Sequence, residues 1–235
     1  MNKILVAAIS VIVAILAGCT STPTFQTGDD TEVTFDGLTR MEGTIMDVVW
    51  ARTDIDLTGY SKVMFEGIGV EYREVDGPYS GRAGMSSSMA RRNNQSEFKL
   101  DDETKAAFEE EVSAAFVESM ARSEVFEVVD TAGPDVLLIR AGLLDVVSRV
   151  PPETMGASII LIDSVGEATL VLEIRSSMSN TIYARAVDGR AASQSFEMQQ
   201  SNRARNRAEV RRLGRRWGDI LRDGLDALLT DGVTQ

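Results

Sequence analysis

The sequence contains no histidine and a single cysteine, Cys19, among its 235 residues. Without histidine the chain cannot form a Ser-His-Asp or Cys-His catalytic group, and it lacks the usual general acid and base of neutral pH. The common zinc and copper sites are excluded as well, because they depend on histidine and cysteine ligands. We therefore expect no metal site and no cofactor, and most hydrolase mechanisms are ruled out.

Positive charge is also scarce, and lysine contributes little of it. The chain has 24 Lys and Arg residues against 36 Asp and Glu residues, which gives a formal net charge of -12. A protein that binds nucleic acid must neutralise phosphates with a basic surface, so this balance argues against a nucleic-acid partner. Hydrophobic residues make up 43% of the chain, which is enough to bury a core.

The apolar run at the N-terminus is too short to cross a membrane. It covers residues 4–16, is broken by Ser10, and follows a cationic start at Lys3. The apolar core of a secretory signal is typically about 7 to 15 residues long, whereas a transmembrane helix needs about 20. We expect residues 1–18 to be a cleaved signal peptide.

The residues at the end of this run resemble the lipobox of bacterial lipoproteins: Leu16, Ala17 and Gly18 stand directly before Cys19. The resemblance implies signal-peptidase cleavage before Cys19 and acylation of that cysteine, so that several fatty chains hold the protein at a membrane. In lipoprotein sorting an Asp after the cysteine favours the inner membrane, so Thr20 implies the periplasmic face of the outer membrane. The alternative is an ordinary signal peptide followed by an unmodified cysteine.

The length of the mature chain predicts one domain. Residues 19–40 are rich in Ser, Thr, Gly and Asp, and we expect them to form the lipidated cysteine and a flexible tether with a span of roughly 25 Å. Residues 41–235 are expected to form a single α+β periplasmic domain. Within it, residues 76–94 are rich in Gly, Ser and Arg, which is typical of a long loop.

Two segments have the 3.6-residue periodicity of amphipathic helices. The first follows a capping Asp101 or Asp102 and repeats Phe108, Val112, Ala115, Phe116 and Met120. The second covers about residues 202–229 and repeats Val210, Leu213, Trp217, Leu221, Leu225 and Leu228. Gly214 and Gly218 weaken this second helix by about 1 kcal/mol each relative to alanine, unless close packing on a sheet favours them.

The remaining segments predict strands. Residues 59–74 have strand-like composition, residues 125–130 form a short strand, and apolar residues alternate in residues 135–150, 165–177 and 182–193. Alternation places Ala168, Leu170, Leu172 and Ile174 on one buried face. Because strands follow one another through hairpins, we predict a mostly antiparallel sheet with two helices packed on one face, which is an α+β fold.

Several segments together resemble one family. They are the lipobox, the tether, the strand YSKVMFEGIGVEY preceded by Trp50 and by Asp56-Leu57, and the hairpin GEATLVLEIRSSMSNTIYARAVDGR with a closing helix that carries a tryptophan. These features resemble the bacterial lipoproteins of domain-of-unknown-function family 3313 (DUF3313). The resemblance implies an architecture for nearly the whole mature chain and assigns no activity.

Arginines gather at the start of the second helix, at positions 203, 205, 207, 211, 212, 215 and 216. Within this group Arg211, Arg212, Arg215 and Arg216 are a candidate site for an anionic envelope partner, such as lipid or lipopolysaccharide phosphates, peptidoglycan carboxylates or an acidic protein groove. The alternative is a solvated helix face whose arginines pair with acids such as Glu209 and Asp219.

Pairs of carboxylates offer an enzymatic alternative, since two acids can cleave glycosidic bonds. The candidates are Asp54 with Asp56, and Asp145 with Asp163. The sequence thus leaves three hypotheses open. The first is a non-enzymatic, lipid-anchored binding or accessory module for an envelope protein or peptidoglycan; the second is a carboxylate-dependent enzyme of cell-wall glycan; the third is a structural tether between outer membrane and wall.

Overall fold

The computed structural model describes residues 23–76, 79–80, 97–151, 161–162, 164–192 and 199–231. The signal peptide, Cys19, Thr20, Asp163 and most of the loop expected at residues 76–94 lie outside the described residues.

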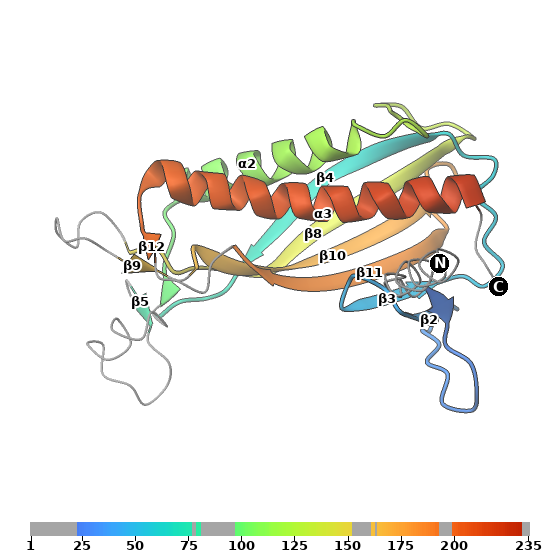
Figure 1. The fold of residues 1–235 in the computed structure, drawn as a ribbon, viewed down its shortest axis with the longest axis horizontal. Helices are drawn as coiled ribbons and strands as arrows, with labels where there is room; N and C mark the ends of the chain where they lie inside the picture. Colours follow the sequence, from blue (N-terminus) through green and yellow to red (C-terminus); the bar gives the residue numbers. More distant parts are fainter. Residues whose placement is uncertain are drawn as a thin grey trace, which may run out of the picture.

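The described chain forms one large sheet with two helices on the same face (Figure 1). Ten strands belong to this sheet: β1 (Thr24–Phe25), β2 (Thr39–Glu42), β3 (Val48–Ala51), β4 (Lys62–Tyr72), β5 (Tyr79–Ser80), β6 (Glu97–Phe98), β7 (Glu127–Val128), β8 (Val136–Ser148), β10 (Gly166–Ser176) and β11 (Ile182–Ala191). Their order is β1-β2-β3-β11-β10-β8-β4-β7, with β6 pairing β8 and β5 pairing β6. A second sheet pairs β9 (Leu161–Ile162) with β12 (Gln199–Gln200).

The first predicted helix is confirmed as α2 (Asp102–Met120). Asp101 is its N-cap, and the Asp101 carboxylate accepts a hydrogen bond from the Thr104 N–H at 2.8 Å. This bond satisfies one of the N–H groups that the first helical turn leaves free. The predicted apolar face is also confirmed, because Val112, Phe116 and Met120 are buried.

The second predicted helix is confirmed as α3 (Arg203–Asp231), which packs along α2 (Figure 1). Gly214 and Gly218 lie at this contact: a Cβ at Gly214 would stand 2.7 Å from the Val112 carbonyl oxygen, and one at Gly218 would stand 2.6 Å from the Ser119 Cβ. Close packing therefore does favour these glycines, but the neighbouring surface is α2 and not the sheet.

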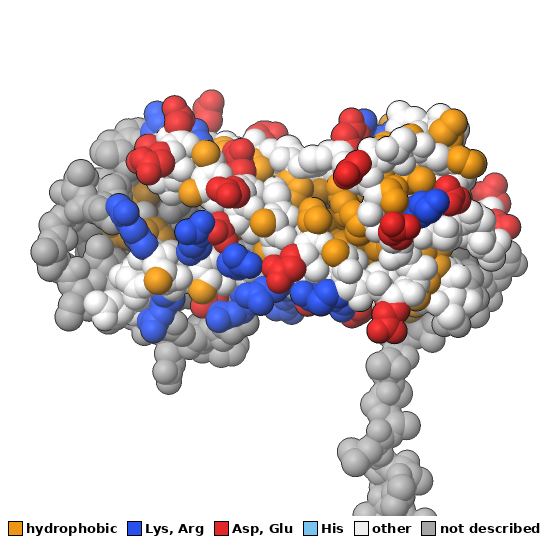
Figure 2. Space-filling model, turned by 90° about the horizontal axis from the view of Figure 1, so that it is seen from above, with side chains coloured by type: hydrophobic (Ala, Val, Ile, Leu, Met, Phe, Trp, Pro, Cys, Tyr) orange, Lys and Arg blue, Asp and Glu red, His pale blue; other side chains and the backbone are white. Residues whose placement is uncertain are grey.

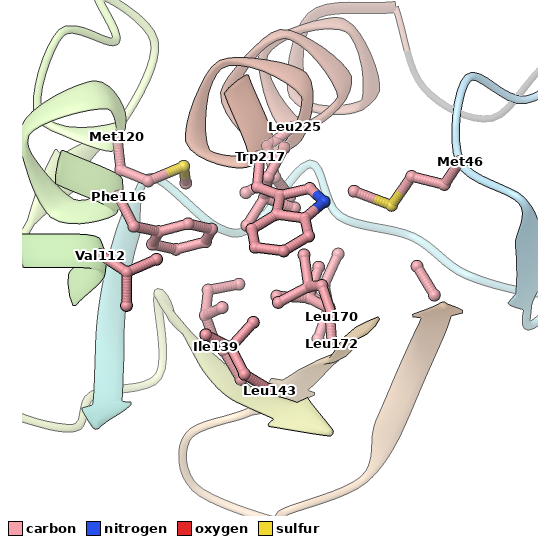
Figure 3. Packing of buried hydrophobic residues seen from close by; sticks show 14 of the residues in the cluster. Met46, Val112, Phe116, Met120, Ile139, Leu143, Leu170, Leu172, Trp217 and Leu225 are labelled. Atoms are coloured by element: carbon pink, nitrogen blue, oxygen red, sulfur yellow. The ribbon is translucent and has the colours of Figure 1, made fainter. Parts of the chain in front are cut away.

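The core lies between the helices and the sheet, with Trp217 of α3 at its centre (Figure 3). Trp217 is 1% exposed and is the largest fully buried side chain among the described residues. Alternation along β10 buries Leu170 and Leu172, and alternation along β8 buries Ile139 and Leu143, as predicted. Period-two patterning thus correctly identified the face of the sheet that the helices cover.

The sheet is mostly antiparallel, as predicted, but β4 does not join it through a hairpin. β4 pairs in parallel with β8 on one side and with β7 on the other. α2 lies between β4 and these two strands in the sequence, and it returns the chain to the starting end of β4. A parallel neighbour requires such a crossover connection, so the expectation of hairpins throughout was wrong at β4.

The expectation of a flexible tether up to residue 40 also needs correction for its described part. β1 pairs with β2, with Thr24 opposite Glu42. Leu38 is fully buried, and the Asp36 carboxylate accepts a hydrogen bond from Arg185 of β11 at 2.9 Å. The polar composition of this segment suits an irregular edge hairpin as well as a coil, so the folded part already includes Thr24.

Two bulges shape β4 and β8. The register between them shifts once after Phe65, where Gly67 has a φ of 48°, and again after Val70, where Asp145 of β8 has a φ of 56°. Each bulge adds one residue to one strand, so the second restores the pairing that the first offsets. β4 consequently continues to Tyr72 alongside β8.

Candidate functional site

The arginines of α3 fall into two groups. The guanidinium of Arg207 pairs with Glu111 of α2, Arg211 lies 3.2 Å from Glu118, and Arg212 lies 2.6 Å from Glu209 of its own helix. Arg207 and Arg211 thus link α3 to α2, and Arg212 pairs with an acid of its own helix. For Arg211 and Arg212 the pairing that the sequence left as the alternative is therefore present.

Arg215 and Arg216 differ from their neighbours. Both side chains are exposed, and neither has an acidic partner among the residues that the structure describes. Figure 2 shows Lys and Arg side chains in a row along one side of the molecule. Of the four candidate residues, these two present uncompensated positive charge to solvent.

A row of charged and aromatic side chains crosses the face of the sheet opposite the helices. In register, Glu173 of β10 stands beside Arg140 of β8 and Arg185 of β11, and Arg185 stands beside Trp50 of β3. Next along the row, the Arg40 guanidinium lies 5.5 Å from the centre of the Trp50 ring, a cation–π distance. Sequence reasoning missed this row because its members come together only through strand register.

Glu173 is the half-buried centre of that row. Its carboxylate accepts hydrogen bonds from Arg175 and Arg185, each at 2.9 Å. Burial alone would raise the pKa of Glu173, but these hydrogen bonds and the two arginine charges outweigh burial and hold the pKa below its ordinary value.

The variant Glu173→Gln is therefore expected to lose less stability than the wild type when the pH is lowered from neutral. A lowered folded-state pKa stabilises the fold above the unfolded value of about 4.3, and this contribution is lost as pH falls through the folded-state pKa. The urea midpoint of the variant should lie below that of the wild type at pH near 7. The difference between the two midpoints should be smaller when the measurement is repeated at a pH below about 4. A constant difference at both pH values would contradict the assignment.

A pocket of about 300 Å³ opens at the end of β4 and β8. Arg73, which lines this pocket, pairs with two acids: it lies 2.5 Å from Glu97, and its Nε donates to Asp145 at 2.7 Å. Lys105 stacks on Tyr72, with its Nζ 5.0 Å from the ring centre. Two of the cations that line the pocket are thus already engaged within the chain.

Two of the carboxylates named from the sequence, Asp56 and Asp145, have structural roles. Asp56 accepts two hydrogen bonds from Thr58 within a turn, and these lower its pKa. The Arg73 guanidinium holds the pKa of Asp145 below its usual range. A lowered pKa makes a carboxyl group a poor general acid at neutral pH. Asp163, the proposed partner of Asp145, lies outside the described residues.

Asp188 is a buried acid that the sequence analysis passed over. It is 1% exposed, and its Oδ2 accepts a hydrogen bond from the Trp217 indole Nε1 at 2.8 Å. Arg190 also donates to it, with 3.0 Å from Nη2 to Oδ1. A signal was present: the alternation of Ile182, Ala184 and Ala186 along β11 continues to position 188 and places it on the inner face.

The described residues include two helices, α2 and α3. Within that part of the chain, neither helix is long and apolar enough to cross a membrane. In the same residues, no group of three or more Cys, Asp or Glu side chains is arranged to hold a metal ion.

A ten-stranded, mostly antiparallel sheet covered on one face by two helices defines an α+β protein. Comparison with family models matches residues 32–218 to "Protein of unknown function (DUF3313)". The match covers most of the chain, so the chain belongs to the DUF3313 family, as its sequence resemblance implied. No curated protein matches the chain.

Solved structures with a similar chain path share little sequence with this protein. Protein XCC0632 from Xanthomonas campestris, of family DUF330, is 9% identical with a TM-score of 0.40, over 74% of this chain and 89% of that one. A PelC dodecamer from Paraburkholderia phytofirmans is 7% identical with a TM-score of 0.34, over 74% and 95%. A homologue of neuraminyllactose-binding hemagglutinin from Helicobacter pylori is 10% identical with a TM-score of 0.32, over 74% and 85%.

Proposed function

We propose that this protein is a lipid-anchored lipoprotein at the periplasmic face of the outer membrane. In this proposal Leu16, Ala17 and Gly18 direct cleavage before Cys19, and the acylated cysteine holds the domain at the membrane. The protein acts there without catalysis, as a binding or accessory module for another component of the cell envelope. The partner is an envelope protein or peptidoglycan that presents anionic groups.

The observation that carries this proposal is the pair Arg215 and Arg216. They are exposed at consecutive positions of α3 and have no acidic partner within the described residues, whereas Arg211 and Arg212 are paired. Each unpaired cation near an anionic surface contributes about 1 kcal/mol of attraction. Exposed charges contribute little to the stability of the fold, so these two arginines are available to bind a partner.

The test is crosslinking of the full lipidated protein in living cells, followed by identification of what is captured. The double variant Arg215→Glu/Arg216→Glu is expected to lose the partner, with about a tenfold or greater fall in crosslinked product. Its melting temperature should match that of the wild type, because both side chains are exposed. The matched control Arg215→Lys/Arg216→Lys keeps the charges and should retain the partner. Equal capture by the glutamate variant would contradict the proposal.

The same experiment includes Cys19→Ser as the control for anchoring. Mass spectrometry of the wild-type protein is expected to show fatty chains on its first residue, and the serine variant should leave the membrane fraction. If both forms fractionate alike and the wild type carries no lipid, the anchoring part of the proposal fails.

A further inference from the structure

In the part of the chain that the structure describes, one side of β4 is paired only at its start. β7 pairs with β4 at Lys62 and Val63, and within the described residues nothing pairs with that side from Met64 to Tyr72. An open strand edge presents N–H and C=O groups that can pair with an added strand. The bulge at Gly67 divides this edge and leaves residues 68–72 as its longest regular stretch.

The backbone groups of this stretch have a defined direction. The Arg73 N–H donates to the Val146 carbonyl oxygen of β8 at 2.9 Å. Because backbone groups of successive strand residues point to opposite sides, those of Tyr72, Val70 and Ile68 point away from β8. Within the described residues, the donors and acceptors of these three residues have no strand partner, and they stand at the spacing of a sheet ladder.

Apolar side chains lie directly beside these groups. Ile68, Val70 and Tyr72 are half-buried and pack on the core. The Phe65 ring, just before the bulge, stands 5.8 Å from the Phe116 ring of α2. Figure 2, which looks at the molecule from above, shows apolar side chains in the middle of the view with acidic and basic side chains around them. A strand added to β4 would therefore cover apolar surface as well as gain backbone hydrogen bonds.

Arg73 and Lys105 lie near this edge and have acidic partners, whereas acids near it include two without one in the described part of the chain. Glu71 of β4 and Glu110 of α2 are exposed, and neither has an ion-pair partner in the described part of the chain. Glu109 lies on the flank of α2 that faces the edge, since it accepts a hydrogen bond from the Tyr72 hydroxyl at 3.0 Å. A second copy of this chain would bring these acids against one another, whereas a basic strand would neutralise them.

We infer that residues 68–72 of β4 form a strand-addition site for an extended segment of a partner protein in which basic and apolar residues alternate. The apolar side chains of the segment lie on the helix side of the sheet, beside Ile68 and Val70. Its basic side chains lie on the opposite side, to which alternation directs Glu71. This inference extends the proposed binding role to a second surface, which is distinct from Arg215 and Arg216. Recognition by strand addition derives affinity from the backbone and specificity from alternate side chains.

The test uses the full mature protein and a fluorescein-labelled decapeptide in which lysine and valine alternate, with fluorescence anisotropy as the measurement. A decapeptide in which glutamate and valine alternate is the probe control, and the lysine peptide should bind about tenfold or more tightly. Val70→Pro removes one outward N–H without touching the β8 ladder and should weaken binding of the lysine peptide by about tenfold. Val70→Thr keeps that N–H and should bind like the wild type.

A second variant tests the inference even if the proline variant fails to fold. Glu71→Lys changes one exposed side chain and should remove the preference for the lysine peptide over the glutamate peptide. The inference is overturned if the wild-type protein binds neither peptide or both equally, or if both variants bind like the wild type. It is also overturned if sedimentation shows a dimer that Val70→Pro converts to monomers. These outcomes leave the arginine-dependent crosslink unaffected, so the two proposals fail separately.

Discussion

Replacing Asp188 with alanine is expected to cost about 3 kcal/mol or more of unfolding free energy, because it removes the acceptor at the centre of a buried polar cluster. The carboxylate accepts from the Trp217 indole at 2.8 Å, from Arg190 at 3.0 Å and from the Asp47 N–H at 3.3 Å. Alanine would leave all three donors without this partner. Arg190 has a side chain that is 17% exposed, so water compensates for its loss only in part.

Urea denaturation at neutral pH measures this effect, and two further variants separate its causes. Asp188→Asn keeps an oxygen for the indole and removes the charge, so its loss should be smaller than that of alanine. Trp217→Phe removes the indole donor, and a double-mutant cycle with Asp188→Ala measures the coupling between the indole and the carboxylate. If Asp188→Ala unfolds at nearly the wild-type midpoint, the cluster does not stabilise the fold.

Replacing Gly218 with alanine should destabilise the protein by about 2 kcal/mol, although alanine is the better helix former by about 1 kcal/mol. The added methyl group would lie 2.6 Å from the Ser119 Cβ and 2.8 Å from the Phe116 carbonyl oxygen, both on α2. Helices packed through a glycine must separate to admit a methyl group, and separation loosens the core around Trp217.

Gly224 supplies the matched control in the same helix. A Cβ at Gly224 would meet nothing within 4 Å. Gly224→Ala should therefore raise stability by about 0.5 to 1 kcal/mol through helix propensity alone. Thermal unfolding followed by circular dichroism compares the two substitutions directly. Shifts of the same sign in both variants would show that the contact between α2 and α3 does not depend on Gly218.

Local pattern was enough to predict much of the fold. The positions of α2 and α3, the Asp101 cap, the alternation in β8 and β10 and the burial of Trp217 all follow from spacing of apolar residues along one element. The family was also recognisable from sequence. These features share a physical basis, because each depends on residues a few positions apart whose faces are fixed by helix or strand geometry.

Contacts between distant segments were decided by the tertiary structure. The parallel pairing of β4, the folded hairpin before residue 40, the packing of Gly218 on α2 and the pairing of Arg211 with Glu118 join residues that are far apart in the chain. The spacing of residues in the sequence does not give the register between such segments. The open edge of β4 therefore became visible only from the order of strands in the sheet, and the unpaired charge of Arg215 and Arg216 only from the ion pairs of α3. By itself the sequence determined which face of each element is apolar, because that depends on local period. The tertiary structure decided which faces, edges and charges remain for binding, because that depends on what each element packs against.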